Sequence, residues 1–312
     1  MGFTVGSLTA YVNEQSTDLL TALHFEGETA GLAYPHPGIK SSEAIQLLAN
    51  TPIAQDGSTC AFNASGDSAF TQAILTVKTL KFQDTLCLRA LEPKWTQLLL
   101  RAGSTYTEAD IPKMIISDVI ELIKQILETA DWTGDTTNWN QNVKQYDGLQ
   151  KIIKAATVLT ASSVAGPVTT SNVRTIVQNI IAKIPAQLKG NPKFKIIMGY
   201  DIASLYQQKT FIDNLYHAPA TKDQKGMYAE GTNHEIIPVH GLDGFGSNNG
   251  DNPFIFGCIP ERNLHYGFDM LNEDEKAEMG LDQYNENAWY TFRLKRGWQI
   301  VYPLEIVEYS NT

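Results

Sequence analysis

The sequence predicts an α+β protein, and three stretches of its 312 residues carry that prediction. A strand-like alternation of apolar and polar residues covers 73–82, and an amphipathic helix is expected over 110–130. A short apolar strand followed by a turn and a helix is expected at 194–208. Because 43% of the residues are hydrophobic, the chain can bury substantial cores around these elements.

The first 44 residues predict an extended arm. They show no helical periodicity, and Pro35 and Pro37 near their end prevent a helix from continuing. Apolar residues are nevertheless scattered along this stretch, which cannot bury them by itself. We therefore expect residues 1–40 to be extended and to make most of their contacts with other copies of the chain.

Residues 45–91 predict a long two-stranded projection with a polar, glycine-containing tip at 55–67. In the returning run, period-two geometry would place one set of residues on a single face: Ile74, Thr76, Lys78, Leu80 and Phe82. An isolated hairpin is marginal in water and cannot keep such a face dry. We expect Leu80 and Phe82 to pack against a neighbouring subunit, with Lys78 and Lys81 on the same projection.

The clearest element is a helix over 110–130. Asp110 and Pro112 are both favoured in the first helical turn, where the amides lack partners within the helix. Two adjoining rows form a wide apolar stripe: Ile115, Val119, Leu122 and Ile126, and beside them Ile116, Ile120, Ile123 and Leu127. With a rise of about 1.5 Å per residue the helix spans on the order of 30 Å, enough to form a spine. The turn-rich residues 131–135 are expected to end it.

The rest of the chain predicts an α/β part followed by returning strands. Helices are expected over 148–156 and 172–184, and the break at 160–170 between them marks a domain boundary. The expected strands are 194–198, 235–239, 254–258, 288–294, 298–301 and 305–309. Because Lys295-Arg296-Gly297 is typical of a short turn, the strands on either side of it are expected to form a hairpin.

No arrangement for catalysis or metal binding is recognisable. The six histidines are dispersed, and His234-Glu235 is followed by Ile-Ile-Pro, so the HExxH metalloprotease pattern is absent. No GxSxG motif surrounds a serine, and the glycine-rich stretch 241–250 lacks the lysine and following helix of a phosphate-binding loop. We expect no catalytic residue, no metal site and no cofactor. A two-domain hydrolase, in which His234 or His240 meets a carboxylate, is the less favoured alternative.

Charge and composition argue against two further classes. The 24 basic and 34 acidic side chains give a net charge of −10, which opposes the attraction to nucleic acid and excludes a free DNA-binding protein. No apolar run approaches the roughly 18 residues that span a bilayer, and no targeting signal is readable, so synthesis in cytoplasm is expected. Cys60, Cys87 and Cys258 are odd in number and widely spaced, which predicts reduced, buried thiols.

Two charged stretches are open to two interpretations each. Acidic residues gather within 268–287, among them Glu273, Asp274 and Glu275. They fit either a solvated loop or a docking surface for a basic partner. Lysines without an intervening acid occur at Lys183, Lys189, Lys193 and Lys195. They fit either a solvated helix end and loop or a contact with the acidic stretch of another subunit.

The order of these elements resembles the HK97-type fold of tailed-phage major capsid proteins. The run 75–82, followed by Glu92-Pro-Lys-Trp95, is similar to the returning strand of the family's E-loop and the lead-in to its spine helix. Further similar segments are 128–135 and 146–149 after the spine helix, 195–206 in the axial domain, and 289–303 with 305–307 in the closing strands. Each motif is weak alone, and their ordered co-occurrence over nearly the whole chain carries the resemblance.

The resemblance implies four regions. These are an N-terminal arm at 1–44, an E-loop at 45–91, a peripheral domain at 92–165 and 254–304 with its spine helix at about 110–130, and an axial domain at 166–253 and 305–312. It implies a major capsid protein that self-assembles into hexamers and pentamers of an icosahedral head shell. The shell would enclose the phage dsDNA genome without sequence-specific binding.

The resemblance also implies a location and partners. The protein is expected in the virion capsid after synthesis in the cytoplasm of a bacterial host, and its middle segments resemble capsid proteins of Bacteroidetes phages. Expected partners are further copies of itself and portal, scaffold and head-decoration proteins, with no membrane. No charged helical scaffolding segment precedes the arm, which implies a separate scaffold protein or self-sufficient assembly. An encapsulin-type compartment, which would enclose a cargo enzyme, shares the fold and is the alternative.

Overall fold

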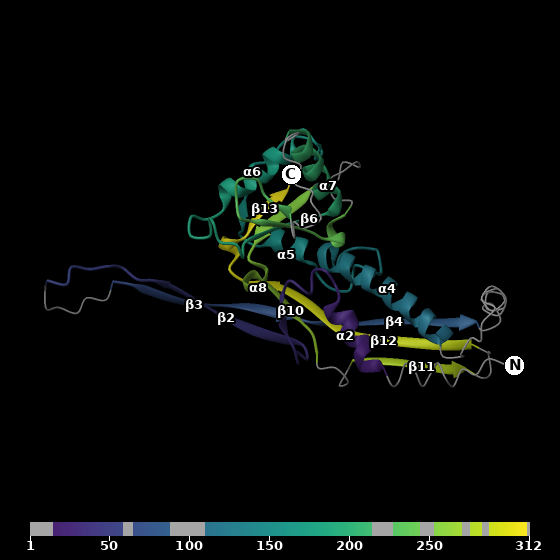
Figure 1. Ribbon diagram of the computed structural model, residues 1–312. Coiled ribbons are helices and arrows are strands. Elements are labelled where there is room, and N and C mark those ends of the chain that lie inside the picture. The colour runs from purple at the N-terminus through teal and green to yellow at the C-terminus, as the bar shows by residue number, and fades with distance from the viewer. Residues whose placement is uncertain are drawn as a thin grey trace.

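Two β-sheets, a long helix and a projecting hairpin make up the chain (Figure 1). The computed structural model describes residues 15–58, 65–87, 110–213, 227–243, 253–269, 275–282 and 287–310. Within these residues the α+β class predicted from the sequence is confirmed. None of the helices that the structure describes is long and apolar enough to cross a membrane.

The first sheet is built around its longest strand, β12. Its strands are β1 (Tyr34–His36), β4 (Lys78–Cys87), β10 (Leu264–Gly267), β11 (Lys276–Asp282) and β12 (Asn287–Ile300). β4, β10 and β11 each pair with β12 in the antiparallel direction, and β1 joins the sheet by pairing in parallel with β10. This sheet lies below the long helix in Figure 1.

The predicted hairpin around Lys295-Arg296-Gly297 is wrong, because β12 continues straight through these residues. A Cβ added to Gly297 would lie 2.1 Å from the carbonyl oxygen of Thr76. Glycine is therefore required here for the close approach of another strand and not for a turn. Arg296 is 1% exposed, so the charged residues that suggested a surface turn belong to the interior.

The second sheet carries the α/β part of the chain. Its strands, in spatial order, are β5 (Leu159–Thr160), β13 (Val307–Ser310), β9 (Phe254–Cys258), β6 (Lys195–Met198), β8 (Glu235–Pro238) and β7 (Met227–Tyr228). Its helices are α6 (Val173–Lys183) and α7 (Tyr200–Asp213), with the short α8 (Pro260–Asn263), η1 (His240–Leu242) and η2 (Pro303–Glu305) in the connections. The predicted helix at 172–184 and the strands of this part are confirmed.

The second sheet is shared by two hydrophobic cores. Along β6, Ile196 and Met198 pack in the core formed with α6 and α7, whereas Ile197 packs in the core that holds the long helix. β9 divides in the same way, with Ile255 on one side and Phe256 on the other. Because successive residues of a strand face opposite ways, one sheet joins both parts by buried contact.

The long helix is α4 (Asp110–Thr133), and α5 (Leu149–Ala155) follows it. Of the two predicted apolar rows, the inner one is confirmed by the burial of Ile116, Ile120, Ile123 and Leu127. The helix ends at Thr133, within the segment 131–135 that was predicted to stop it. Asp131 lies in its last turn, where it is fully buried and accepts a hydrogen bond from Nε of Arg296.

The predicted extended arm is wrong over much of its length. Residues Ser16–Phe25 form helix α2, whose Leu20 and Leu23 are buried in the core of the same chain. A helix this short shows too few apolar repeats to stand out as periodic. The described part of 1–40 thus packs Leu20 and Leu23 within its own chain. That this segment makes most of its contacts with other copies stays a prediction, and the first 14 residues lie outside the described residues.

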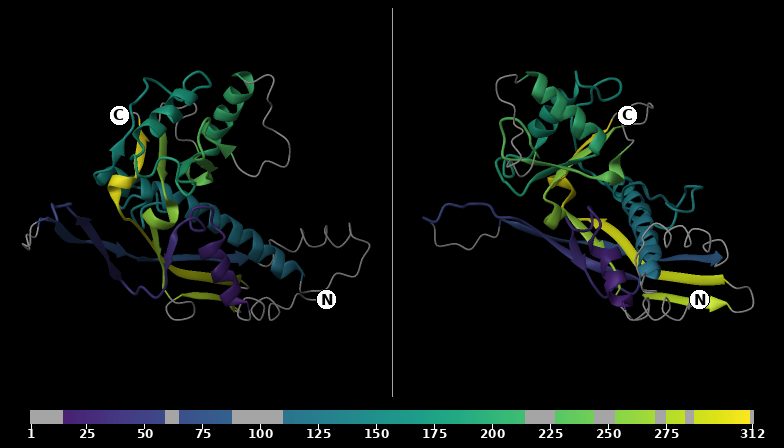
Figure 2. Two further views of the ribbon diagram at one scale, coloured as in Figure 1. Left: turned by 60° about the vertical axis from the view of Figure 1, so that its left-hand side comes forward. Right: turned by 45° about the vertical axis from the view of Figure 1, so that its right-hand side comes forward.

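The projecting hairpin consists of β2 (Ser42–Thr51) and β3 (Asp67–Thr76), which, among the described strands, pair only with each other. It extends away from the body in all three views (Figures 1 and 2). Only Val77 separates β3 from β4, so the chain passes directly from the hairpin into the first sheet.

Candidate assembly surface

The hairpin carries a row of apolar side chains on one face. Its register places Leu48 opposite Phe70 and Ala44 opposite Ile74, and residues two apart along a strand share a face. Phe70 is 74% exposed, Ile74 57% and Leu48 47%. We call Leu48, Phe70 and Ile74 the hairpin row. A lone hairpin cannot shield such a row, so this face is suited to a partner.

The base of the hairpin is fixed to the body. Ile39, Leu75 and Val77 form a small buried cluster, and the half-buried Ile45 packs against it. The backbone amide of Val77 donates to the carbonyl of Ser41 at 2.9 Å. Because these contacts lie on the inner side of the base, the fold itself sets which face of the hairpin points outward.

The predicted interface residues Leu80 and Phe82 lie inside the chain. Leu80 is 4% exposed and belongs to the large core, and Phe82 is half-buried against the same core. The prediction assumed one unbroken alternation over 73–82. Instead the inward positions are Leu75 and Val77 and then Leu80, because the chain passes at Val77 from the hairpin into the first sheet.

The predicted lysines of the projection also lie on the body. Lys78 and Lys81 are residues of β4, opposite Arg296 and Arg293 in the register with β12, and both lysine side chains are exposed. They are therefore surface groups of the first sheet, and no contact in the described residues assigns them a partner subunit.

A second apolar row lies on the outer side of α4. Leu122 is 59% exposed, and Val119 and Ile126, one helical turn before and after it, are half-buried. These residues belong to the predicted row that begins at Ile115, and this row does not enter the core as fully as the inner row that begins at Ile116. The outer side of α4 is thus another surface that a partner could cover.

The loop 134–148 presents the most exposed large hydrophobic side chain of the described residues, Trp139, which is 90% exposed. The loop is closed by a hydrogen bond from the amide of Gly148 to the carbonyl of Gly134 at 2.8 Å. A Cβ on Gly134 would lie 2.5 Å from the Ala130 carbonyl oxygen, so a larger residue would open this closure. Exposed tryptophans on ordered loops are common anchors of protein interfaces.

A lysine braces the same loop. The Lys151 Nζ donates to Oδ1 of Asp135 and to Oδ1 of Asp147, each at 2.7 Å. The bond from Lys151, followed by bonds from Thr137, lowers the pKa of Asp135 to about 2. The sequence analysis did not single out Trp139, although the run of Asp and Asn around it is typical of side chains that cap tight turns.

The predicted acidic stretch contains buried residues, the exposed Glu278, and residues outside those that the structure describes. Glu275 is fully buried, lies 2.8 Å from Nε2 of His24, and accepts a hydrogen bond from the backbone amide of Lys295 at 2.9 Å. Asp269 is also fully buried and pairs with the Lys295 Nζ at 2.7 Å. Glu275 is therefore not part of a docking surface for a basic partner. Glu273 and Asp274 lie outside the described residues.

Three of the four predicted lysines lie at the surface, unlike the buried Asp269 and Glu275 of the acidic stretch. Lys183, Lys189 and Lys193 are all exposed, and none of the three forms an ion pair with another residue that the structure describes. Lys195 is half-buried and pairs with Glu235 at 3.2 Å. A contact of the three exposed lysines with an acidic surface of another subunit stays a prediction.

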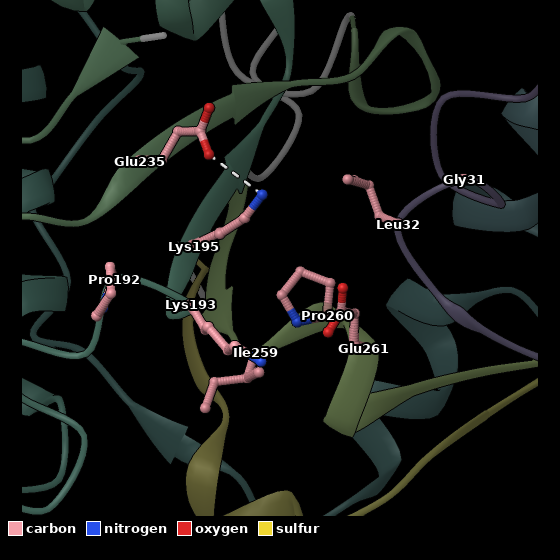
Figure 3. A pocket seen from close by; sticks show the side chains of 9 residues that line it. All are labelled: Gly31, Leu32, Pro192, Lys193, Lys195, Glu235, Ile259, Pro260 and Glu261. Atoms are coloured by element: carbon pink, nitrogen blue, oxygen red, sulfur yellow. Dashed lines mark ion pairs between the residues drawn. The ribbon is translucent and has the colours of Figure 1, made fainter.

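A shallow pocket of about 370 Å³ lies between Lys193 and Lys195 on one side and Gly31 and Leu32 on the other (Figure 3). Its lining is Gly31, Leu32, Pro192, Lys193, Lys195, Glu235, Ile259, Pro260 and Glu261. The ion pair between Lys195 and Glu235 crosses one wall, and no serine or cysteine lines the pocket. This lining therefore offers no hydroxyl or thiol nucleophile of the kind that serine and cysteine hydrolases use.

The other candidates for chemistry also lack a reactive partner. His240 does meet carboxylates, with its Nδ1 2.8 Å from Oδ2 of Asp243, but no serine or cysteine of the described residues bonds to it. His234 is buried beside the Phe194 carbonyl. Burial raises the pKa of the Cys258 thiol far above its ordinary value, so this cysteine is unreactive. The described residues contain no group of three or more ligating side chains arranged for a metal ion.

Solved structures show what this architecture is similar to. The capsid of an empty GTA particle matches 91% of this chain and 89% of its own, with a TM-score of 0.61 at 9% identity. The procapsid of satellite phage P4 including the size determination protein Sid matches 94% and 90%, with a TM-score of 0.60 at 11% identity. A virus-like particle from Pyrococcus furiosus matches 94% and 96%, with a TM-score of 0.51 at 11% identity. No protein-family model and no curated protein matches the sequence.

Proposed function

We propose that this chain, which has the HK97-type fold of phage capsid proteins, is the major capsid protein of a tailed bacteriophage. In this role it assembles with copies of itself into hexamers and pentamers that form an icosahedral head shell around the dsDNA genome. The likeness to capsid structures over about nine tenths of both chains supports the architecture. The hairpin row is the observation in this chain that carries the proposal, because it leaves apolar surface that only another molecule can cover.

Self-association explains the three exposed apolar features together. The hairpin row projects far from the core, the Leu122 row lies on α4, and Trp139 stands on a braced loop. A monomer would leave all of them in water. Covering a large apolar side chain contributes roughly 1.5 to 3 kcal/mol, so a few such contacts repeated at every subunit hold a shell together.

The regions implied by the resemblance take definite roles in this proposal. The E-loop corresponds to the hairpin, the peripheral domain to α4 with the first sheet, and the axial domain to the second sheet with α6 and α7. Portal, scaffold and head-decoration proteins are further proposed partners. The net charge of −10 suits enclosure of DNA without tight binding to it.

The test is assembly of the purified full chain. We expect size-exclusion chromatography and cryo-electron microscopy to show closed particles with hexameric and pentameric units, alone or after addition of a scaffold protein encoded beside it. A protein that stays monomeric at high concentration with every scaffold candidate would contradict the proposal.

An encapsulin-type compartment that encloses a protein cargo is the second candidate. The likeness to the virus-like particle from Pyrococcus furiosus, at 96% coverage of that chain, favours keeping it. The contents of particles isolated from their natural source separate the two candidates. Double-stranded DNA at head density supports the capsid, and a co-purifying enzyme without DNA supports the compartment.

A further inference from the structure

Histidines gather where residues 16–43 contact the rest of the chain. His24 and His36 belong to this segment, and His240 and His265 lie on the surfaces that it contacts. Of the histidines that the structure describes, His234 alone lies elsewhere. Histidine is the side chain whose charge changes near neutral pH, so these contacts can respond to protons.

The contact between His36 and His265 can hold only a limited number of protons. Nε2 of His36 lies 2.7 Å from Nδ1 of His265, and the ring centroids are 4.9 Å apart. At this distance one of these two nitrogens donates a proton and the other must accept it, so the accepting nitrogen carries no proton. If both rings were fully protonated, two N–H groups and two positive charges would face each other.

The surroundings favour one shared proton. Glu43 of β2 lies 3.6 Å from Nδ1 of His36, while the backbone carbonyl of Arg262 in α8 lies 3.2 Å from Nε2 of His265. The ring of Tyr34 in β1 flanks both histidines, and the Arg262 guanidinium is engaged with Glu305. Burial lowers the pKa of His265 below its usual range and the charge of His36 lowers it further, against the opposing effect of the Arg262 carbonyl.

This histidine pair is placed where it can control β1. β1 pairs with β10 over three residues only, from Tyr34 opposite His265 to His36 opposite Gly267. The amide of Phe268 donates to the His36 carbonyl at 3.1 Å, and the amide of Ile39 donates to the Phe268 carbonyl at 3.0 Å. Beyond Ile39 the chain enters β2, so this junction holds the base of the hairpin.

A second contact of residues 16–43, between Glu28 and His240, depends on pH in the opposite direction. The backbone amide of His240 donates to Glu28 at 2.7 Å, and its ring lies against Asp243, Glu28 and the stacked ring of Tyr200. The bond to Asp243, assisted by the charges of Glu28 and Glu128, raises the pKa of His240. Protonation therefore favours this contact, which lies upstream of β1.

We propose that the His36–His265 pair is a proton-sensitive latch, which holds β1 on β10 near neutral pH and releases it on acidification while the Glu28–His240 contact keeps the preceding residues in place. A neutral His265 stabilises the closed junction fully above its unfolded pKa of about 6.5, and this stabilisation is lost as the pH falls below that value. His240 has the reverse dependence, since its contact weakens only as the pH rises through its elevated pKa.

Hydrogen exchange on the full chain tests the latch. Amide exchange would be followed by mass spectrometry at pH 7.5 and pH 5.0, corrected for intrinsic rates, with the assembly state checked to be the same at both values. We expect the segments 34–39 and 264–268 to open more often at pH 5.0, by at most about tenfold per pH unit because one proton is involved. Residues 27–30 should become no less protected.

Two variants separate the latch from general acid damage. His265→Gln retains a hydrogen-bonding side chain without a titratable group, so the pH dependence at the β1–β10 junction should disappear. His240→Gln is the matched control and should leave that dependence intact. Equal corrected exchange at both pH values in the wild type, or an unchanged pH dependence in His265→Gln, would overturn the proposal.

A measurement on the wild type covers the case in which His265→Gln does not fold. Proton NMR of the histidine Cε1–H resonances should show His265 titrating below 6.5 and coupled to His36. Independent titration of the two rings at ordinary values would also exclude the latch.

Discussion

The core beneath the end of α4 and the outer face of the hairpin distribute charged and apolar groups in opposite ways. In the core, Arg296 is 1% exposed and Asp131 is fully buried. On the hairpin, Phe70 is 74% exposed and Ile74 is 57% exposed. Both arrangements are unfavourable for an isolated group, and each is tolerable only when a partner is supplied.

The two regions differ in where that partner comes from. Asp131 accepts hydrogen bonds from Nε of Arg296 at 2.8 Å, from Nε1 of Trp298 at 2.6 Å and from the hydroxyl of Tyr146 at 2.6 Å. The core thus satisfies its own charges with groups drawn from distant parts of one chain. The hairpin row has no such group within the described residues. The first arrangement stabilises the fold of the chain itself, and the second leaves a surface that another copy would cover in the proposed shell.

Removing the charge partner in the core should have the largest effect. In Asp131→Ala the buried Arg296 guanidinium loses its counter-charge, which typically costs about 3 to 5 kcal/mol of the free energy of unfolding. Urea denaturation of the monomer measures this loss. Asp118→Ala, on the exposed side of the same helix, is the control and should change stability by less than about 0.5 kcal/mol. If both variants lost similar amounts of the free energy of unfolding, the ion pair between Asp131 and Arg296 would not be a main source of stability.

Leu80→Ala tests the boundary between body and hairpin. Because Leu80 is buried in the core of its own chain, truncation should reduce the free energy of unfolding by about 2 to 5 kcal/mol. Thr79→Ala, at an exposed position beside it, should have little effect. If Leu80→Ala instead left the monomer stable and blocked only assembly, Leu80 would belong to the intersubunit surface after all.

On the hairpin, the double variant Phe70→Asp with Ile74→Asp should spare the subunit and block the shell. These side chains contribute little to the monomer, but each stands to gain roughly 1.5 to 3 kcal/mol when covered by a neighbour. Circular dichroism would show a folded chain, and electron microscopy would show no particles. The control Thr71→Asp adds a charge to the other face of β3 and should still assemble. If the double variant still formed particles, the hairpin row would not be needed for contacts between copies.

The braced loop provides the smallest and most local test. Asp135 contributes stability to the loop above its ordinary pKa of 3.8, and this contribution is lost as the pH falls through about 2. Lys151→Gln removes the main cause of the shift, so the pKa of Asp135 should rise towards its ordinary value, as NMR titration of its carboxyl carbon would show. Lys154→Gln on the same helix should leave the pKa of Asp135 unchanged.

The sequence predicted the elements whose pattern repeats over many residues. The inner row of α4 and the helix α6 were readable because four apolar residues recur at helical spacing in each. The errors arose where long-range contacts decide the local structure. Gly297 looked like a turn residue, and only the approach of Thr76 shows that it is a crossing point.

The sequence predicted that an exposed apolar surface exists on a hairpin, but it assigned this surface to the wrong residues. A projecting hairpin with an apolar face was expected, yet the face was assigned to Leu80 because the alternation was taken to continue past Val77. A change of sheet leaves the composition of a strand unaltered, so period-two counting cannot detect it. Phe70 was missed because it precedes the stretch that was counted. Glu275 was expected at the surface, in a solvated loop or a docking surface, because sequence proximity does not show that His24 and Lys295 surround it.

The direct continuation of β3 into β4 has a mechanical consequence. A neighbour that pulls on the hairpin along its length loads β4 along the strand axis, and β4 is paired with β12 over ten residues. In that geometry the ladder of backbone hydrogen bonds is sheared, so the bonds share the load and must fail together, whereas a perpendicular pull would unzip them one at a time. The tension therefore passes into β12, the longest of the described strands, beside the buried Arg296, so that in the proposed shell a load on the hairpin would be carried by this ladder.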